Sequence, residues 1–376
     1  MQNQKKVCFF FVNTTDIQEF TGLIIESAKA GMSVTIMIFD IVTKKRNFYY
    51  YSLSDFENHF NELFLKNGIK EKCQIKKYGV EDRSKFSKDY DLINPDLVFT
   101  RNLYKLKYTV WHPEIDASKT AVYIWEHPET MMDYSASLIA LARYDSGNIG
   151  FRTNKTIYVP TGRVGYIGTD HVENVCEELI DFCKNKKTCF IPETWARGAE
   201  DKSNNLPLIL DVVKSLKSMG YSIVWKMREK GYPSQVDYSL NYVKEIEPYV
   251  DLVTKRDLNY PSNLYYLMKN CDMTCIFNVT STALDSAHLS KNPFVFLSKH
   301  LSPKYRSKLE VGNHLSWGPF YENLDSNVNL YDEKYNDTPI KEFLLSREDT
   351  KRKQLKTEGS EGVHRRLVDK LLKKIS

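Results

Sequence analysis

The fold of this chain is decided by residues 272–297, which read DMTCIFNVTSTALDSAHLSKNPFVFL. Residues 272–277 predict a short buried strand, and the apolar run Phe294–Leu297 predicts a second strand after a short helix. A helix N-terminus leaves backbone N–H groups without internal partners, and its dipole favours negative charge. Ser and Thr in the intervening turn can therefore cap the helix and also donate to phosphate oxygens. The segment predicts an open α/β sheet that holds a nucleotide diphosphate beyond one of its strands.

The residues before this segment repeat the same alternation of strand and helix. The predicted strands are Thr188–Ile191 and Tyr221–Met227, with a polar loop over 193–205, a helix that begins at Asn205 and ends at Gly220, and a further helix over Asn263–Asn270. Pro207 lies in the first turn of the helix that Asn205 caps, a position that proline tolerates. This half of the chain is predicted to be Rossmann-like.

The N-terminal half opens with its own β-α-β unit. Val7–Val12 predicts a buried parallel strand, and Thr15 with Gln18 forms a capping-box signature at the start of a helix that ends at Gly31. The further predicted elements are a strand over 33–42, a helix over 53–65, and strands over 95–100, 120–125 and 157–162. Asn13–Thr15 follows the first strand in place of a glycine-rich dinucleotide fingerprint, so a standard NAD site is disfavoured.

The length of 376 residues favours two domains. We expect an α/β protein with two Rossmann-like domains and a central cleft, the GT-B-like architecture. The expected segments are an N-terminal acceptor domain over 1–184, a C-terminal nucleotide-donor domain over 185–350, and a basic helix over 351–376. Ligands are expected at the carboxyl ends of the strands, as in other open α/β sheets.

Composition excludes several classes of protein. The net charge is only +5, and no long basic run precedes the C-terminal tail, so a nucleic-acid partner is not expected. The seven cysteines contain no CxxC pair and have no His cluster beside them, which argues against a metal site and suits a reducing cytoplasm. No run of about 18 apolar residues occurs, so we expect a cytoplasmic protein, at most peripheral to the membrane.

Residues 190–297 resemble the CDP-glycerol glycerophosphotransferases and related GT-B transferases of surface polysaccharides. The matching pieces occur in order: 191–197 (IPETWAR), 223–228 (IVWKMR), 264–272, 278–285 and 293–294. Asn278 stands where the family has an acidic residue, and the nearest counterpart of its His-Gly motif is 123–129 (YIWEHPE). The resemblance implies a CDP- or UDP-linked donor in the second half, with no further cofactor and no metal.

Two groups of residues are candidates for the donor phosphates. The first is the turn itself, in which Thr280, Ser281 and Thr282 would contact phosphate and Asp285 would brace the turn or bind a donor hydroxyl. The alternative is a capped, buried helix whose Asp bonds its own loop.

The second group is basic. Lys226 and Arg228 alternate with apolar residues, so both face one side of a strand end and can neutralise a diphosphate. Arg197 lies in a polar loop that can cover the donor. The alternative for all three is a set of solvated surface charges.

The catalytic base is sought in the first half. His127 ends an apolar strand, with Glu126 and Glu129 beside it, and an imidazole or carboxylate there can take the proton of an acceptor hydroxyl. The sequence His112-Pro113-Glu114 nearly duplicates this motif and is a second candidate. The alternative is a structural His before a Pro that stops the strand.

These observations predict a transferase that moves a sugar or polyol-phosphate unit from a nucleotide-activated donor to a hydroxyl of a cell-surface glycan or lipid-linked acceptor. A UDP-sugar epimerase and a non-catalytic glycan- or nucleotide-binding protein remain as alternatives. The basic tail carries Val368, Leu371, Leu372 and Ile375 at helical spacing. It either touches anionic lipid or, as the apolar spacing favours, packs back on the first domain.

Overall fold

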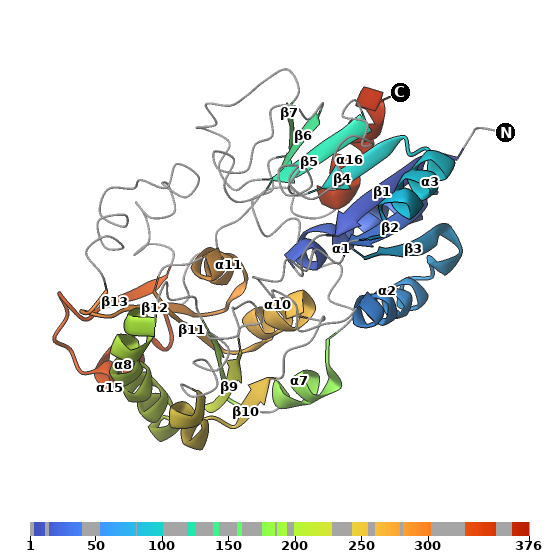
Figure 1. The fold of residues 1–376 in the computed structure, drawn as a ribbon. Helices are drawn as coiled ribbons and strands as arrows, with labels where there is room; N and C mark the ends of the chain where they lie inside the picture. Colours follow the sequence, from blue (N-terminus) through green and yellow to red (C-terminus); the bar gives the residue numbers. More distant parts are fainter. Residues whose placement is uncertain are drawn as a thin grey trace. The chain divides into compact units, whose positions relative to one another are not determined.

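The chain forms two compact units in the computed structural model (Figure 1). One comprises Met1–Asn174 with Thr357–Ser376, and the other comprises Val175–Lys356. The structure describes residues 4–11, 15–39, 53–79, 81–100, 119–124, 138–142, 156–159, 175–184, 186–193, 199–227, 243–254, 260–278, 281–301, 328–350 and 363–375. No helix in these ranges is both long and apolar enough to cross a membrane.

Unit 1 is built on a seven-stranded parallel sheet of order β3-β2-β1-β4-β5-β6-β7. Its elements are β1 (Lys6–Phe11), α1 (Thr15–Lys29), β2 (Ser33–Phe39), α2 (Leu53–Lys66), β3 (Cys73–Tyr78), α3 (Arg83–Ile93), β4 (Leu97–Thr100), β5 (Thr120–Ile124), β6 (Leu138–Ala142), β7 (Thr156–Val159) and α16 (Val363–Ile375), with a 3₁₀ turn over Lys70–Lys72. Aromatic rings fill its core: Phe9 of β1 stacks on Phe99 of β4 at 4.9 Å between centroids, and Phe20 of α1 lies 5.7 Å from Phe9. Continuous apolar runs such as FFF in β1 are what a strand buried on both faces requires.

Helix α16 belongs to unit 1, although it comes last in the chain. It contacts α1 and β7, and its apolar residues Leu367, Val368 and Leu371 are buried. Gly22 of α1 lies directly beneath the ring of His364, so closely that a side-chain carbon at Gly22 would overlap the ring. The packing of the tail on the first domain, which its apolar spacing favoured, is therefore confirmed. Contact with lipid stays a prediction.

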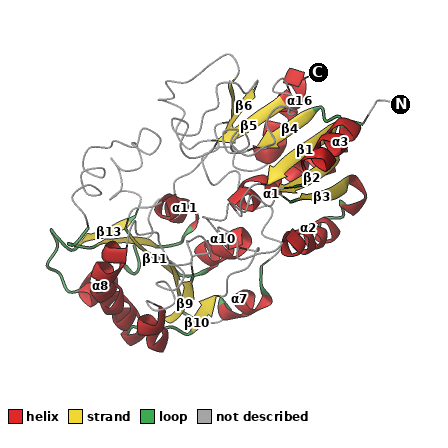
Figure 2. Ribbon diagram, in the orientation of Figure 1, coloured by secondary structure: helices red, strands yellow, loops and turns green. Residues whose placement is uncertain are grey.

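Unit 2 is built on a six-stranded parallel sheet of order β10-β9-β8-β11-β12-β13. Its elements are α7 (Glu177–Phe182), β8 (Thr188–Pro192), α8 (Ala199–Ser218), β9 (Ser222–Lys226), a 3₁₀ turn over Glu247–Tyr249, β10 (Leu252–Thr254), α10 (Tyr260–Asn270), β11 (Met273–Phe277), α11 (Ser281–Leu289), β12 (Pro293–Leu297), β13 (Asn329–Asp332) and α15 (Ile340–Arg347). One face of the sheet packs against α8 and α15, and the other carries α11 (Figures 1 and 2). Both units are thus doubly wound α/β domains, and the predicted fold class is confirmed.

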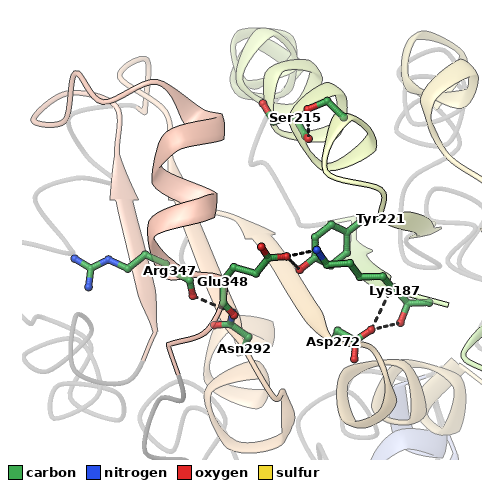
Figure 3. A network of polar contacts seen from close by, with 9 residues as sticks. Lys187, Ser215, Tyr221, Asp272, Asn292, Arg347 and Glu348 are labelled. Carbon is green, nitrogen blue, oxygen red and sulfur yellow. Dashed lines mark hydrogen bonds and ion pairs between the residues drawn. The ribbon is translucent and has the colours of Figure 1, made fainter. Parts of the chain in front are cut away.

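A polar network ties the end of α15 to the amino ends of the central strands (Figure 3). The side-chain amide of Asn292 donates to the carbonyl oxygens of Arg347 (3.1 Å) and Glu348 (2.8 Å), which lie at the C-terminus of α15. The carboxylate of Glu348 accepts from the Tyr221 hydroxyl at 2.7 Å and pairs with Lys187. The bond to Lys187 lowers the pKa of Glu348. Partial burial opposes this shift, and the Tyr221 hydrogen bond adds to it. The network satisfies helix-end carbonyls that would otherwise lack partners.

The structure corrects the predicted start of one helix. Asn205 was expected to cap it and Pro207 to lie in its first turn, but α8 begins at Ala199 and both residues lie inside it. Because helix propensity is a weak prior, the packing of α8 on the sheet outweighs the missing N–H of one proline. Gly220 does end the helix, with a φ of 82° that favours glycine.

The boundary between the units comes earlier than the interval 184–187 that we expected. Unit 2 begins at Val175, and the residue that precedes α7 bonds to α10. The Cys176 N–H donates to the side-chain oxygen of Asn263 at 3.1 Å. Strands β3, β6, β10 and β13 were not predicted from the sequence. The central cleft stays a prediction.

Candidate functional site

The order of strands in unit 2 marks one place for a ligand. The chain passes from β8 to β9 and β10 on one side, and later returns to β11 on the other side of β8. The connections at the carboxyl ends of β8 and β11 therefore diverge, and a crevice opens there in sheets of this kind. The turn that was singled out from the sequence follows β11 at this point.

Buried polar side chains gather along the carboxyl ends of these strands. Glu193 directly follows β8 and is 9% exposed, Lys226 ends β9 and is 2% exposed, Thr254 ends β10 and is 7% exposed, and Asn278 follows β11 and is 4% exposed. Burying polar and charged groups costs free energy unless other polar groups compensate for the lost water. This row of buried polar side chains makes the carboxyl edge of the sheet the candidate site of unit 2.

Lys226 projects to the face of the sheet that carries α11. Its neighbour Trp225 belongs to the core beneath α8, and side chains alternate between faces along a strand. In the register of the sheet Lys226 pairs with Pro192 of β8 on one side and with Thr254 of β10 on the other. The Glu193 N–H donates to the Lys226 carbonyl at 2.8 Å and continues this ladder by one residue. Lys226 is therefore not one of the solvated surface charges that the sequence left as an alternative.

Asn278 makes the turn between β11 and α11. Its N–H donates to the Phe296 carbonyl at 2.9 Å, and its φ of 67° then takes the chain out of the strand. Asparagine is one of the few side chains that tolerate this left-handed conformation. Among the residues that the structure describes, its buried Oδ1 has no hydrogen-bond partner. A polar atom in this state, three residues before the first residue of a helix, is suited to bind a polar ligand.

Helix α11 is held firmly on the sheet. Ala283 and Ala287 pack against Ile276 and Val295 of β11 and β12. The small side chains allow the helix to lie close to the strands, so its first N–H groups are fixed in position. Thr282 in the first turn is partly exposed, as a residue that meets a ligand must be.

Polar side chains of α11 are buried as well. The Ser286 hydroxyl lies 3.0 Å from that of Ser290, which donates to the Thr274 hydroxyl of β11 at 2.9 Å. Asp285 is fully buried. Of the roles considered for Asp285, complete burial favours bracing the turn over contact with a donor hydroxyl.

The remaining predicted site residues are placed as follows. Ser281 begins α11, but its side chain is not described. Thr280, Arg197, Arg228, Glu126, His127, Glu129 and His112 lie outside the described residues. The structure thus brings Lys226, Thr282 and Asp285 to one domain edge, and the base stays a prediction.

Two polar residues of this edge were not predicted from the sequence. Glu193 lies within the quoted segment IPETWAR, but a lone Glu after a strand gives no signal of burial. Thr254 ends the three-residue strand β10, which was itself not predicted. Only the sheet order places both beside Lys226.

The chain matches known proteins in its structure but not in its sequence. No family model matches the chain, and no curated protein matches it. Among solved structures, the UDP-GlcNAc 2-epimerase from Methanocaldococcus jannaschii superposes with a TM-score of 0.59 at 11% identity, covering 98% of this chain and 100% of that chain.

Two further structures have the same architecture. The UDP-GlcNAc 2-epimerase from Neisseria meningitidis bound to UDP-GlcNAc gives a TM-score of 0.52 at 12% identity over 98% of this chain and 100% of that chain. UGT73P12 of Glycyrrhiza uralensis, complexed with glycyrrhetinic acid 3-O-monoglucuronide, gives 0.55 at 8% identity over 99% and 96%. At such identities the likeness shows the fold, which is that of GT-B proteins.

Proposed function

We propose that this protein is a GT-B transferase that moves a sugar or polyol-phosphate unit from a nucleotide-activated donor to a hydroxyl of a surface glycan or lipid-linked acceptor. The observation that carries the proposal is the turn at Asn278, where a buried amide oxygen and a fixed helix N-terminus lie at the switch point of unit 2. The sequence resemblance of residues 190–297 to glycerophosphotransferases supports the same reading.

The donor phosphates are assigned to the start of α11. Backbone N–H groups and the Thr282 hydroxyl donate to phosphate oxygens there, and the helix dipole favours their charge. The ammonium of Lys226, on the same face of the sheet, adds a cation at the edge. These groups stabilise the negative charge that grows on the leaving phosphate as its bond to the transferred unit breaks.

The acceptor is assigned to unit 1. A base removes the proton from the acceptor hydroxyl as the hydroxyl oxygen bonds to the transferred unit, and the nucleotide leaves with the bonding electrons. His127, Glu126 and Glu129 are the proposed bases, since imidazole and carboxylate groups can take a proton from a hydroxyl.

A second function is favoured by the fold neighbours. The structures from M. jannaschii and N. meningitidis are UDP-GlcNAc 2-epimerases, and this chain covers their full length. An epimerase changes its nucleotide-linked sugar without any acceptor. Incubation with a labelled donor and no acceptor tests this second function, because an epimerised donor supports it and an unchanged donor counts against it.

Ligand binding tests the assignment of Lys226. In titration calorimetry, Lys226→Met should bind UDP or CDP with about 1.5–3 kcal/mol less binding free energy than the wild type, the value of a charge-assisted hydrogen bond. The loss for the bare nucleoside should be much smaller. Lys269→Met is the matched control, because Lys269 is an exposed lysine of α10 in the same unit. If nucleotide and nucleoside lose the same binding free energy, and the far-UV spectrum is unchanged, Lys226 does not contact the phosphates.

Thermal-shift measurements can identify the nucleobase of the donor. CDP-, UDP-, GDP- and CMP-linked compounds are compared on the wild-type protein. A ligand present at about a hundred times its dissociation constant adds about 2.7 kcal/mol of stability. A protein that binds none of the four would lose the proposed function, and one that binds a donor but turns over no acceptor would be a binding protein.

A further inference from the structure

Two cysteines lie side by side where helices α7 and α10 end. Cys183 follows α7 and Cys271 follows α10, and their sulfur atoms are 3.8 Å apart. The other ends of the two helices are also joined, since the side chain of Asn263 accepts from the Cys176 N–H at 3.1 Å and donates to its sulfur at 3.3 Å. The two helices are therefore joined near both ends, and the sulfurs of Cys183 and Cys271 lie in contact.

The two thiols differ in their surroundings. Cys183 is half-buried and Cys271 is buried. The hydrogen bond from Cys271 and the charge of Lys291 lower the pKa of Cys183 in spite of its partial burial. The hydrogen bond to Cys183 and burial raise the pKa of Cys271. Cys183 is thus the thiol that ionises first, and it is the one that a reagent in solution can reach.

A second pair shows that proximity is not sufficient. Cys189 of β8 and Cys275 of β11 have sulfurs 3.6 Å apart, closer than the first pair. Both are fully buried, and burial raises the pKa of the Cys189 thiol. A thiol that neither ionises nor meets solvent does not enter thiol–disulfide exchange in the folded protein.

We propose that Cys183 and Cys271 form a reversible disulfide when the protein meets a small-molecule disulfide such as oxidised glutathione. The Cys183 thiolate attacks one sulfur of oxidised glutathione, forms a mixed disulfide, and expels one glutathione thiolate. Cys271 then loses its proton, attacks the Cys183 sulfur, and expels the second glutathione. The two cysteines are oxidised by two electrons, and one glutathione disulfide is reduced to two thiols.

The bond would close the chain from 183 to 271, which includes β8, α8, β9, β10 and α10. A cross-link over such a long loop lowers the conformational entropy of the unfolded chain and so stabilises unit 2. It also ties α7, through which the chain enters unit 2, to the helix that leads into β11 and the turn at Asn278. This inference does not depend on the proposed function.

The test uses the full chain, equilibrated with reduced and oxidised glutathione at several ratios, then alkylated and digested. Peptide mass spectrometry should find Cys183 joined to Cys271, while Cys189 and Cys275 remain free thiols. The unfolding midpoint of the oxidised protein should rise by several degrees and return with dithiothreitol. In Cys271→Ser, Cys183 should retain a bound glutathione, and in Cys183→Ser, Cys271 should remain reduced.

Other outcomes overturn the proposal. A disulfide between Cys189 and Cys275, or one that includes Cys176, would show that accessibility does not select the pair. If all four cysteines of the two pairs remain thiols after equilibration with oxidised glutathione, the pair of Cys183 and Cys271 does not react. Because the wild-type protein alone decides these results, a variant that folds poorly leaves the test intact.

Discussion

Replacing Gly22 by alanine should strain the contact between the first and last helices of unit 1. The new Cβ would overlap Cε1 of His364 and stand 2.5 Å from its Nδ1, well inside van der Waals contact. The His364 ring is buried, so it has little space into which it can turn. Either the ring adopts a strained position or α16 moves away from α1.

Two opposing terms set the size of the effect. Overpacking of a filled core costs about 1–3 kcal/mol, and alanine in place of glycine within a helix returns about 0.5–1 kcal/mol. Release of α16 would expose Leu367, Val368 and Leu371, at about 1.5–3 kcal/mol each, which exceeds the cost of the strain. The helix should therefore stay in place, with a net loss of about 1–2 kcal/mol.

Urea unfolding of a double-mutant cycle measures this term. Gly22→Ala should lower the free energy of unfolding in the wild-type background. In the His364→Ala background, where the ring is absent, the same change should be neutral or stabilising. The coupling energy between the two positions should be about 1–3 kcal/mol, the cost of the overpacking alone. If Gly22→Ala stabilises the protein while His364 is present, the close packing described here is refuted.

Four further outcomes are expected. Ser281→Ala with Thr282→Ala should weaken nucleotide binding by a few kcal/mol at most in calorimetry, with an unchanged far-UV spectrum; undiminished affinity would count against the turn. His127→Ala should reduce turnover about 10²–10⁴-fold with little change in donor affinity, and wild-type turnover should fall at low pH as the imidazole gains a proton; full activity in the variant would exclude His127. Asn278→Gly should unfold at nearly the wild-type urea concentration, whereas Asn278→Ala should lower the free energy of unfolding by about 1–2 kcal/mol. Equal stability of the two variants would contradict the left-handed conformation of Asn278. Glu348 has a pKa below its usual 4.5 in the folded protein, so its contribution to stability is present above that pH and is lost as the pH falls further; Glu348→Gln should flatten the acid limb of the stability curve, and an unchanged limb would contradict this.

The sequence predicts the parts of this fold that carry strong local patterns. Strand β1 has a continuous apolar run, and β11 leads directly into a hydroxyl-rich helix start, so both were found with their neighbours. Strand β3 (CQIKKY) lies at the edge of its sheet and has mostly polar residues, and β10 has only three residues. Such strands form because a neighbouring strand supplies hydrogen bonds, which no local pattern records.

The same distinction explains what was found of the candidate site. The turn after β11 was identified because strand, turn and helix adjoin in the chain. Thr254, Lys226 and Glu193 come from three separate strands, and parallel pairing brings them together at one edge. The burial of Lys226 also depends on tertiary packing, because a lysine at a strand end is solvated in most proteins.

The return of α16 to unit 1 has a consequence for synthesis on the ribosome. Unit 2 is one continuous stretch, Val175–Lys356, so all of its strands are present before α16 has been translated. Unit 1 lacks the helix that covers Gly22 and β7 until Val363–Ile375 has been made. The first domain to be made is therefore the last to be completed, and its closing contacts span almost the whole chain. Contacts of such long sequence separation form slowly, so a nascent unit 1 would expose apolar surface to chaperones for longer than unit 2.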